Sequence, residues 1–334
     1  MKKILLFIVI SILFYSCHQQ EKPIIAFYYW KTIFKLSSSE KEILKLNNVK
    51  KLYIRYLDVD LSLQTNQPIP LAPIHFKDQP IGFTIVPVVY IKNNVMLSKS
   101  LKINDLVNKL TKYIKQINTK NNIKIKEIQI DCDWTLTSKD NYLEFINKFK
   151  KANSSKLSAT IRLHQIKYFN KTKIPNVDKG VLMYYNMGTI ATDSLNSIYN
   201  AKIASKYLSS LKNYPLKLNV ALPIYSWAIH SRSNRVLGLK NKINVSNLKK
   251  DTNFISIKNN LYKVKNSNFK QSTYYKVGDI LKIELISKEN LLEMATNLKQ
   301  NLKKNPQEII FYDLDQFNFQ QYEKNIFTKI STSF

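Results

Sequence analysis

The sequence predicts a (β/α)8 barrel, and two observations support this fold class. Beyond residue 24, eight short apolar runs rich in Ile, Val, Tyr and Phe recur, and several are separated by stretches with helical periodicity. Strands and helices that alternate over about 300 residues match the size and element order of such a barrel. An open doubly wound sheet is the alternative architecture.

The elements follow from local patterns along the chain. Strands are expected at 24–30, 51–58, 82–91, 124–133, 156–163, 179–186, 217–225 and 307–313. The clearest helix is 103–118, where Ile103, Leu106, Leu110 and Ile114 form part of one apolar stripe. Further helices are expected at 39–46, 139–150, 193–212 and 288–303. The segments after the second and fifth strands lack a helical pattern, and several prolines from Pro68 to Pro73 predict a loop after the second.

A long segment separates the seventh strand from its helix. Residues 228–287 contain strand-like runs of their own at 254–258, 261–265 and 280–286. We therefore expect one barrel domain over residues 24–334, with a small β-rich subdomain inserted at about 228–287 on one rim.

The amino terminus resembles a targeting signal. Lys2 and Lys3 precede an apolar run from Ile4 to Phe14, which is too short for a stable membrane-spanning helix. Cys17 directly follows the small Ser16, as in the lipobox of bacterial lipoproteins. The expected division is a signal peptide at 1–16, lipidation at Cys17 and a tether at 17–23. The protein would then lie in the cell envelope, anchored to the outer membrane, with the periplasmic and surface sides both open. A plain cleaved signal and an uncleaved anchor are the alternatives.

Composition excludes several function classes. Lys and Arg total 52 against 23 acidic residues, a formal charge of +29, but only four of these cations are Arg and the lysines are spread along the whole chain. Because base and phosphate recognition favours the bidentate Arg fork, no nucleic-acid partner is expected. The five glycines show neither the dinucleotide nor the P-loop spacing, and no His or Cys residues have metal-ligand spacing. We expect no cofactor and no metal.

Chemistry in a barrel of this kind is expected where the strands end. Asp131 and Asp133 are two residues apart on the fourth strand, so both project to one face and repulsion should raise one of their pKa values. This suits proton transfer, although strand capping or ion pairing explains the same residues. Further candidates for substrate binding at the strand ends are Trp30, Asp58, Trp134, Thr135, Arg162, Tyr185, Asn186, Tyr225, Trp227, Tyr312, Asp313 and Asp315. Aromatic rings combined with carboxylates and an amide are typical of a sugar-binding cleft, although Trp30 and Trp134 also fit simple packing.

Four of these strand ends, in order, resemble glycoside hydrolase family 18, the chitinase-like barrels. Residues 128–135 (IQIDCDWT) are similar to the D-G-x-D-x-D-x-E signature of its fourth strand, and 183–186 (MYYN) to M-x-Y-[DN] of the sixth. Residues 221–225 (ALPIY) are similar to G-x-P-x-Y, and 311–315 (FYDLD) to W-S-x-D with Tyr for Trp. The inserted segment falls where many members carry an α+β insertion. The Q-I-D-x-D run also resembles a bacterial family of unknown function, which fits a divergent branch.

The resemblance implies a binding site without the usual acid. The Asp–x–Asp carboxylates of the family's signature match Asp131 and Asp133. The family's residues that contact the acetamido group of the substrate match Tyr185 and Asn186. The family's general acid is a Glu at the position of Thr135, and a hydroxyl group cannot protonate a glycosidic oxygen as a carboxylic acid does. The leading Asp of the signature is also replaced, by Ile128.

Three classes of function stay open at this stage. One is a glycoside hydrolase or lyase in which Asp131 or Asp133 has become the acid, with Asp313 or Asp315 across the mouth. Another is a glycan-binding lipoprotein that no longer hydrolyses its ligand. A third is a scaffold in an outer-membrane complex. The identity of the glycan and the oligomeric state are not determined by the sequence.

Overall fold

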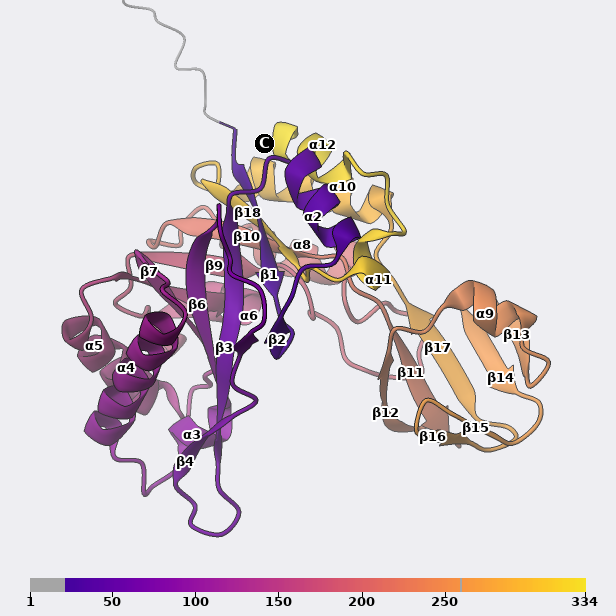
Figure 1. Ribbon diagram of the computed structural model, residues 1–334. Coiled ribbons are helices and arrows are strands. Elements are labelled where there is room, and N and C mark those ends of the chain that lie inside the picture. Colours follow the sequence, from indigo (N-terminus) through magenta and orange to yellow (C-terminus); the bar gives the residue numbers. More distant parts are fainter. Residues whose placement is uncertain (1–21, 259) are drawn as a thin grey trace, which may run out of the picture.

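A computed structural model describes residues 22–258 and 260–334 and confirms the predicted barrel (Figure 1). The signal peptide, Cys17 and most of the tether lie outside the described residues. Within the described part of the chain, no helix is both long enough and apolar enough to cross a membrane.

Eight parallel strands form the barrel, and each hydrogen-bonds to its neighbours. They are β1 (Ile24–Tyr29), β3 (Lys51–Leu61), β6 (Thr84–Ile91), β7 (Glu127–Asp131), β8 (Lys156–Arg162), β9 (Lys179–Met183), β10 (Leu218–Pro223) and β18 (Glu308–Tyr312). Strand β1 pairs with both β18 and β3, which closes the sheet. This closure rules out the open doubly wound sheet, because an open sheet leaves two unpaired edges.

Helices cover the outside of the barrel unevenly. The longer ones are α2 (Ser38–Leu46), α4 (Ile103–Lys120), α5 (Lys139–Ala152), α8 (Ala201–Leu208), α10 (Lys288–Asn301) and α12 (Ile326–Thr332). Short turns of helix complete the set at α3 (Asn93–Leu97), α6 (Leu163–Lys167), α7 (Phe169–Thr172) and α11 (Gln316–Phe319). The apolar stripe predicted for residues 103–118 is buried along α4, as expected for an amphipathic helix on a sheet.

The helix expected at 193–212 is wrong over its first third and at its end. Only Ala201–Leu208 is helical. Before it, the side chain of Asp193 accepts a hydrogen bond from the amide of Leu195, and that of Asn196 accepts one from the amide of Ile198. Side chains of this type offer the backbone an alternative to helical hydrogen bonds, so the segment stays a loop.

No helix follows β3, in agreement with its prolines. Strand β4 (Pro68–Leu71) folds back on β3 as an antiparallel hairpin instead. The short strands β2 (Ile33–Phe34) and β5 (His75–Phe76) pair beside it.

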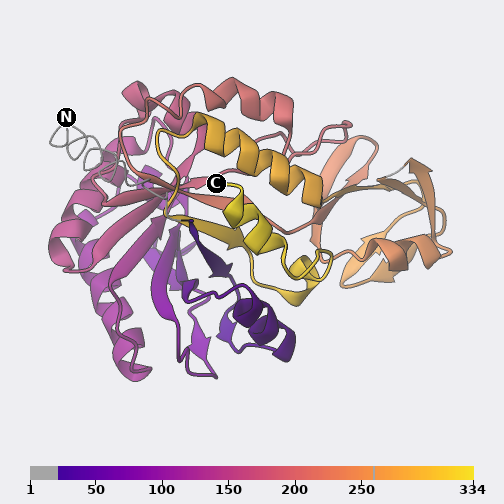
Figure 2. The same ribbon diagram turned by 90° about the horizontal axis from the view of Figure 1, so that it is seen from above.

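The insertion after β10 is a β-rich subdomain with its own core. It contains β11 (Trp227–Arg232), β12 (Arg235–Asn241), α9 (Val245–Lys250), β13 (Phe254–Lys258), β14 (Leu261–Val264), β15 (Asn268–Lys270), β16 (Thr273–Tyr275) and β17 (Ile280–Glu284). Five of these strands form one sheet in the order β12-β11-β17-β14-β13. Figures 1 and 2 show that the subdomain projects from one side of the barrel. Its buried cluster, which includes Phe254, Tyr262 and Leu281, is separate from that of the barrel.

A layer of buried charges closes the barrel where its strands begin. The first residues of the second, fourth, sixth and eighth barrel strands are Lys51, Glu127, Lys179 and Glu308. Each ammonium contacts both carboxylates at 2.8–2.9 Å, and the hydroxyl of Tyr53 donates to Glu308 at 2.5 Å. Four side chains from alternate strands are the usual content of one barrel layer. This layer fills the interior of the barrel at the end where the strands begin.

Candidate functional site

A cleft of about 570 Å3 opens where the barrel strands end. Eleven of the residues named from the sequence line it together, although they lie at the ends of six barrel strands and at the start of β11. They are Trp30, Asp131, Asp133, Arg162, Tyr185, Asn186, Tyr225, Trp227, Tyr312 and the pair Asp313 and Asp315 on the loop after β18. Parallel strands bring their ends to one rim, which is why residues so distant in sequence meet here.

The floor of the cleft is a cluster of aromatic rings around Tyr312. Its ring centroid lies 5.3 Å from that of Trp30, 5.6 Å from that of Tyr185 and 5.7 Å from that of Tyr225. The ring of Trp227 extends this cluster, at 5.3 Å from Tyr225. These separations are in the range of favourable aromatic contacts, so the rings hold one another in place without a ligand. The cleft therefore has a preformed, largely rigid aromatic floor.

Asp131 is the last residue of β7 and the deepest carboxyl group of the cleft. Its side chain is almost fully buried and accepts a hydrogen bond from Thr160 at 2.7 Å. Burial raises the pKa of Asp131 to about 6. The positive charge of Arg162 opposes this rise, and the negative charge of Asp133 adds to it. A carboxyl group in this range holds or releases a proton near neutral pH.

Asp133, two residues further on, is bound by Arg162 at the end of β8. The guanidinium donates to both carboxylate oxygens, from Nε to Oδ1 and from Nη2 to Oδ2, the latter at 3.1 Å. The same guanidinium lies over the ring of Tyr185, 6.0 Å from its centroid. Although burial lowers the pKa of Arg162, Asp133 and Asp131 raise it above its ordinary value. The Asp133 carboxylate is therefore committed to an ion pair and is poorly placed to donate a proton.

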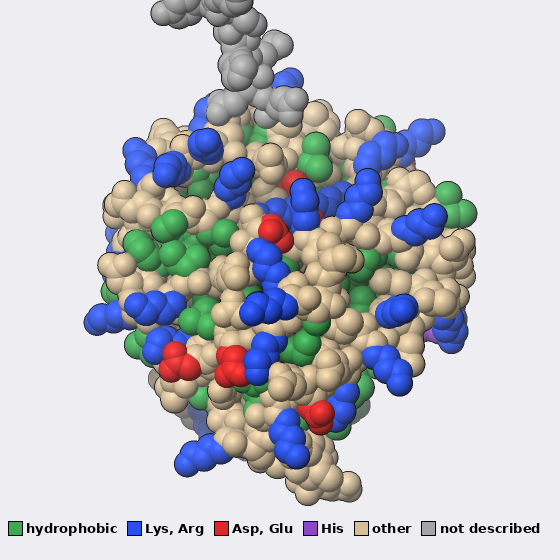
Figure 3. Space-filling model, turned by 90° about the vertical axis from the view of Figure 1, so that its left-hand side faces the viewer, with side chains coloured by type: hydrophobic (Ala, Val, Ile, Leu, Met, Phe, Trp, Pro, Cys, Tyr) green, Lys and Arg blue, Asp and Glu red, His purple; other side chains and the backbone are tan. Residues whose placement is uncertain are grey.

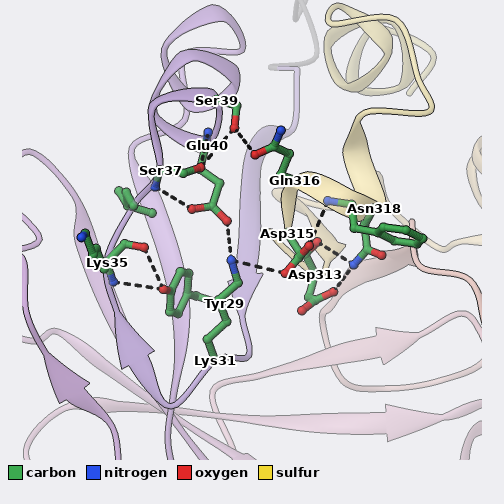
Figure 4. Close-up of polar contacts among 12 residues, drawn as sticks. Tyr29, Lys31, Lys35, Ser37, Ser39, Glu40, Asp313, Asp315, Gln316 and Asn318 are labelled. Carbon is green, nitrogen blue, oxygen red and sulfur yellow. Dashed lines mark hydrogen bonds and ion pairs between the residues drawn. The ribbon is translucent and has the colours of Figure 1, made fainter. Parts of the chain in front are cut away.

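A second acidic pair lies across the cleft after β18 (Figure 4). Burial raises the pKa of Asp313 to about 6, with a further contribution from Asp315, and the side-chain amide of Asn318 donates to its carboxylate. Asp315 contacts the ammonium of Lys242 at 2.8 Å and that of Lys31 at 3.3 Å. These two lysines outweigh the effect of burial and hold the pKa of Asp315 below its ordinary value.

Lys31 links this pair to helix α2. Its ammonium lies 2.5 Å from the buried carboxylate of Glu40, which also accepts a hydrogen bond from the amide of Ser37 in the capping box of the helix (Figure 4). The start of α2 thereby fixes the position of Lys31 in the cleft wall.

The inserted subdomain forms another wall of the cleft. The indole of Trp227 donates to Glu284 at 2.8 Å, and Glu284 in turn contacts Lys282 at 2.8 Å. Lys282 also reaches Asp193 in the loop after β9, at 3.1 Å. The hydroxyl of Tyr225 donates to the side chain of Asn186 across the cleft. Subdomain, loop and barrel are thus joined around the site by buried polar contacts.

Three candidates from the sequence lie outside the cleft. Trp134 is fully buried behind it and stacks on Tyr142 of α5, with ring centroids 4.3 Å apart. Thr135 is exposed, because β7 has already ended at Asp131, and its amide donates to Ser138 in the turn that leads to α5. Asp58 lies beyond a bulge in β3, next to the hairpin partner β4, and its nearest cation is Arg55 at 3.5 Å.

Seven lining residues were not anticipated from the sequence. They are Lys31, Tyr90, Met183, Ser226, Asn241, Lys242 and Asn318. Tyr90, Met183 and Ser226 lie near the ends of barrel strands and could have been found by the same rule that gave the others. Asn241 and Lys242 come from the insertion, and no local pattern indicates that they face the cleft. Within the described residues, no group of three His, Cys, Asp or Glu side chains is arranged to hold a metal ion.

Comparison with known proteins identifies the fold. No protein family model matches the chain, and no curated protein does. Among solved structures, the spore cortex-lytic enzyme SleL of Bacillus cereus is 13% identical, with a TM-score of 0.57 over 94% of this chain and 75% of its own. A chitinase from Bacteroides thetaiotaomicron is 12% identical, with a TM-score of 0.55 over 94% of this chain and 97% of its own. A family 18 chitinase from Cycas revoluta, solved in complex with (GlcNAc)4, is 12% identical, with a TM-score of 0.53 over 92% and 98%. The chain therefore shares the (β/α)8 barrel fold of these chitinases and of the cortex-lytic enzyme.

Proposed function

We propose that the cleft binds a glycan and that the protein is a carbohydrate-binding barrel anchored in the cell envelope. The observation that carries this proposal is the aromatic floor around Tyr312, bordered by carboxylates, lysines and the Asn186 amide in a cleft of about 570 Å3. Sugar rings pack their C–H faces on aromatic side chains, while their hydroxyl groups hydrogen-bond to charged and amide groups at the edge. A cleft of this volume can accommodate a short stretch of oligosaccharide.

Binding without hydrolysis by the family's usual route is favoured by two local features. Thr135, at the position of the general acid, is exposed and directed into a turn rather than into the cleft. The neighbouring Asp133 is held by both ends of the Arg162 guanidinium. Neither residue is therefore suited to protonate a leaving group.

A glycosidase with a relocated acid is the second candidate function. It is favoured by the raised pKa values of Asp131 and Asp313, each about 6, at two sides of the same cleft. A carboxyl group that stays protonated near neutral pH is the usual general acid of glycosidases, and a second carboxylate completes their chemistry. In this case one of the two donates the proton to the glycosidic oxygen.

The envelope anchor rests on the amino-terminal residues. The Ser16–Cys17 pair after an apolar run supports cleavage before Cys17 and its lipidation. Metabolic labelling with a palmitate analogue in a bacterial host, compared with a Cys17→Ser variant, tests this step. Label on both proteins, or on neither, would contradict the anchor.

The function itself is tested by incubating purified residues 22–334 with a panel of oligosaccharides and recording complexes and products by mass spectrometry. The panel includes acetylated and deacetylated amino sugars. We expect complexes without cleavage. Cleavage that disappears in an Asp131→Asn or Asp313→Asn variant would establish the relocated-acid enzyme instead. Absence of any complex or product would reject both candidates and favour a scaffold role.

A further inference from the structure

The barrel carries unpaired positive charge at the end where its strands begin. Six exposed lysines lie at or just before the strand starts: Lys50, Lys126, Lys156, Lys217, Lys303 and Lys304. None of them forms an ion pair with an acidic side chain that the structure describes. The one acidic residue directly before a strand start, Asp178, is already bound to Lys150 at 3.0 Å and to the amide of Leu157 at 2.7 Å. We refer to the surface of these six lysines as the strand-start face.

The cations around the cleft, at the opposite end of the barrel, are paired with acids. Around the cleft, Lys31 and Lys242 contact Asp315, Lys92 contacts Asp60, and Arg162 contacts Asp133. These four cations around the cleft each contact an acid, whereas the six lysines of the strand-start face do not. Figure 3 views a lateral face of the barrel, where Lys and Arg side chains also outnumber acidic ones.

A recess of about 400 Å3 deepens the strand-start face between the beginnings of β9, β10 and β18. Lys217, Lys303 and Lys304 line it, and Leu216 and Leu302 form part of its apolar wall. Ammonium groups beside an apolar wall are complementary to the phosphate and glycerol region of a lipid headgroup.

The chain leaves the barrel on this same face. Strand β1 begins at Ile24 beside the start of β18, and the carbonyl of Pro23 accepts a hydrogen bond from Ser331 at 2.5 Å (Figure 1). Cys17 precedes this point by only six residues, and an extended chain spans at most about 3.5 Å per residue. A lipid on Cys17 would therefore hold the strand-start face within about 20 Å of the membrane surface.

We propose that the strand-start face rests on a membrane surface of anionic lipids, whose phosphate groups contact its unpaired lysines, so that the glycan cleft opens away from the membrane. This inference rests on the anchoring part of the proposed function and adds the orientation of the barrel and the chemistry of the surface beneath it. Basic residues close to an anionic bilayer attract it within about 10 Å, the screening length at about 0.1 M salt.

The test uses residues 22–334, which contain every described strand and helix and lack Cys17, so that lipidation does not enter. Binding is measured by co-sedimentation with phosphatidylcholine vesicles that contain or lack phosphatidylglycerol. The variant is Lys217→Gln, Lys303→Gln, Lys304→Gln. The matched control is Lys249→Gln, Lys250→Gln, Lys258→Gln, which removes the same charge from exposed, unpaired lysines of the inserted subdomain.

We expect binding only to the vesicles with phosphatidylglycerol, weakened by added salt. Each lysine near an anionic surface contributes about fivefold to the partition coefficient, so the strand-start variant should lose roughly a hundredfold and the control about fivefold or less. Equal losses in the two variants would mean that net charge alone is responsible and would overturn the proposal. Binding to neutral vesicles, or to polyphosphate but not to vesicles, would overturn it as well.

Glycan binding is measured on the same preparations. Both triple variants lie outside the cleft, so their oligosaccharide complexes should match those of the wild type. Vesicle binding without any glycan complex would contradict only the glycan proposal, whereas glycan complexes without vesicle binding would contradict only the membrane orientation.

Discussion

Replacement of Asp131 by Asn should stabilise the protein, and the gain should depend on pH. The carboxyl group is 4% exposed at the base of the cleft, and its pKa is raised from 3.8 to about 6. Between these two values the folded protein holds a proton that the unfolded chain releases, so stability falls as pH rises through this window. Above it, the cost of the buried charge is constant.

The magnitude follows from the size of the shift. A difference of about 2 pKa units at about 1.36 kcal/mol per unit corresponds to about 3 kcal/mol. The amide of Asn has nearly the same shape, carries no charge and can still accept the hydrogen bond from Thr160. Asp131→Asn should therefore have the same free energy of unfolding as the wild type at about pH 4, and one larger by about 3 kcal/mol at about pH 7.5.

Urea denaturation followed by far-ultraviolet circular dichroism, at several pH values, measures this difference. An Asp140→Asn variant, on the exposed first turn of α5, makes the same substitution outside the cleft and is the control. A difference between wild type and Asp131→Asn that stays constant from about pH 4 to about pH 7.5 would refute the reasoning, since it would mean that the folded state does not raise the pKa of Asp131.

Three further predictions test the cleft and the barrel. Tyr312→Ala should weaken oligosaccharide binding by about five- to 150-fold in titration calorimetry, because a stacked aromatic contributes about 1–3 kcal/mol. The exposed Tyr168→Ala should leave the affinity unchanged, and equal affinities for both variants would exclude Tyr312 from the binding surface. Thr135→Glu should not produce hydrolysis in a reducing-end assay, since this position faces a turn outside the cleft, and turnover would show that the backbone can still present an acid there. Glu308→Gln should cost about 3–5 kcal/mol in urea denaturation, because Lys51 and Lys179 lose a buried charged partner. The exposed Glu323→Gln should cost much less, and similar losses in the two variants would contradict the role given to the charged layer.

Much of the barrel could be predicted from the sequence because its strands carry a strong local signal. Strands buried on both faces must be apolar over their whole length, and all eight apolar runs proved to be barrel strands. Boundaries were less accurate: the fourth strand ends at Asp131 rather than at 133, and the helix expected at 193–212 is reduced to Ala201–Leu208. In both places side chains compete with the regular backbone pattern, and this competition is not visible in hydrophobic periodicity.

The end point of the fourth strand decided which of the residues around it belong to the site. By the alternation of a β-strand, residues 131, 133 and 135 should project to the same face of the fourth strand. In the structure, Trp134 packs against Tyr142 of α5 and draws the chain out of the barrel, so Thr135 does not reach the cleft. Contacts between elements overrode the local alternation.

The sequence by itself determined the fold class, the order of the strands, the position of the insertion and eleven of the residues that line the cleft. Each of these depends on patterns within a few residues and on the rule that parallel strands end at one rim. Only the tertiary structure decided that Lys51, Glu127, Lys179 and Glu308 form one layer, that Lys242 of the insertion reaches Asp315, and that the unpaired lysines share the face from which β1 begins. These pairings join side chains up to 257 residues apart. Closure of the barrel brings them together, and no local periodicity records it.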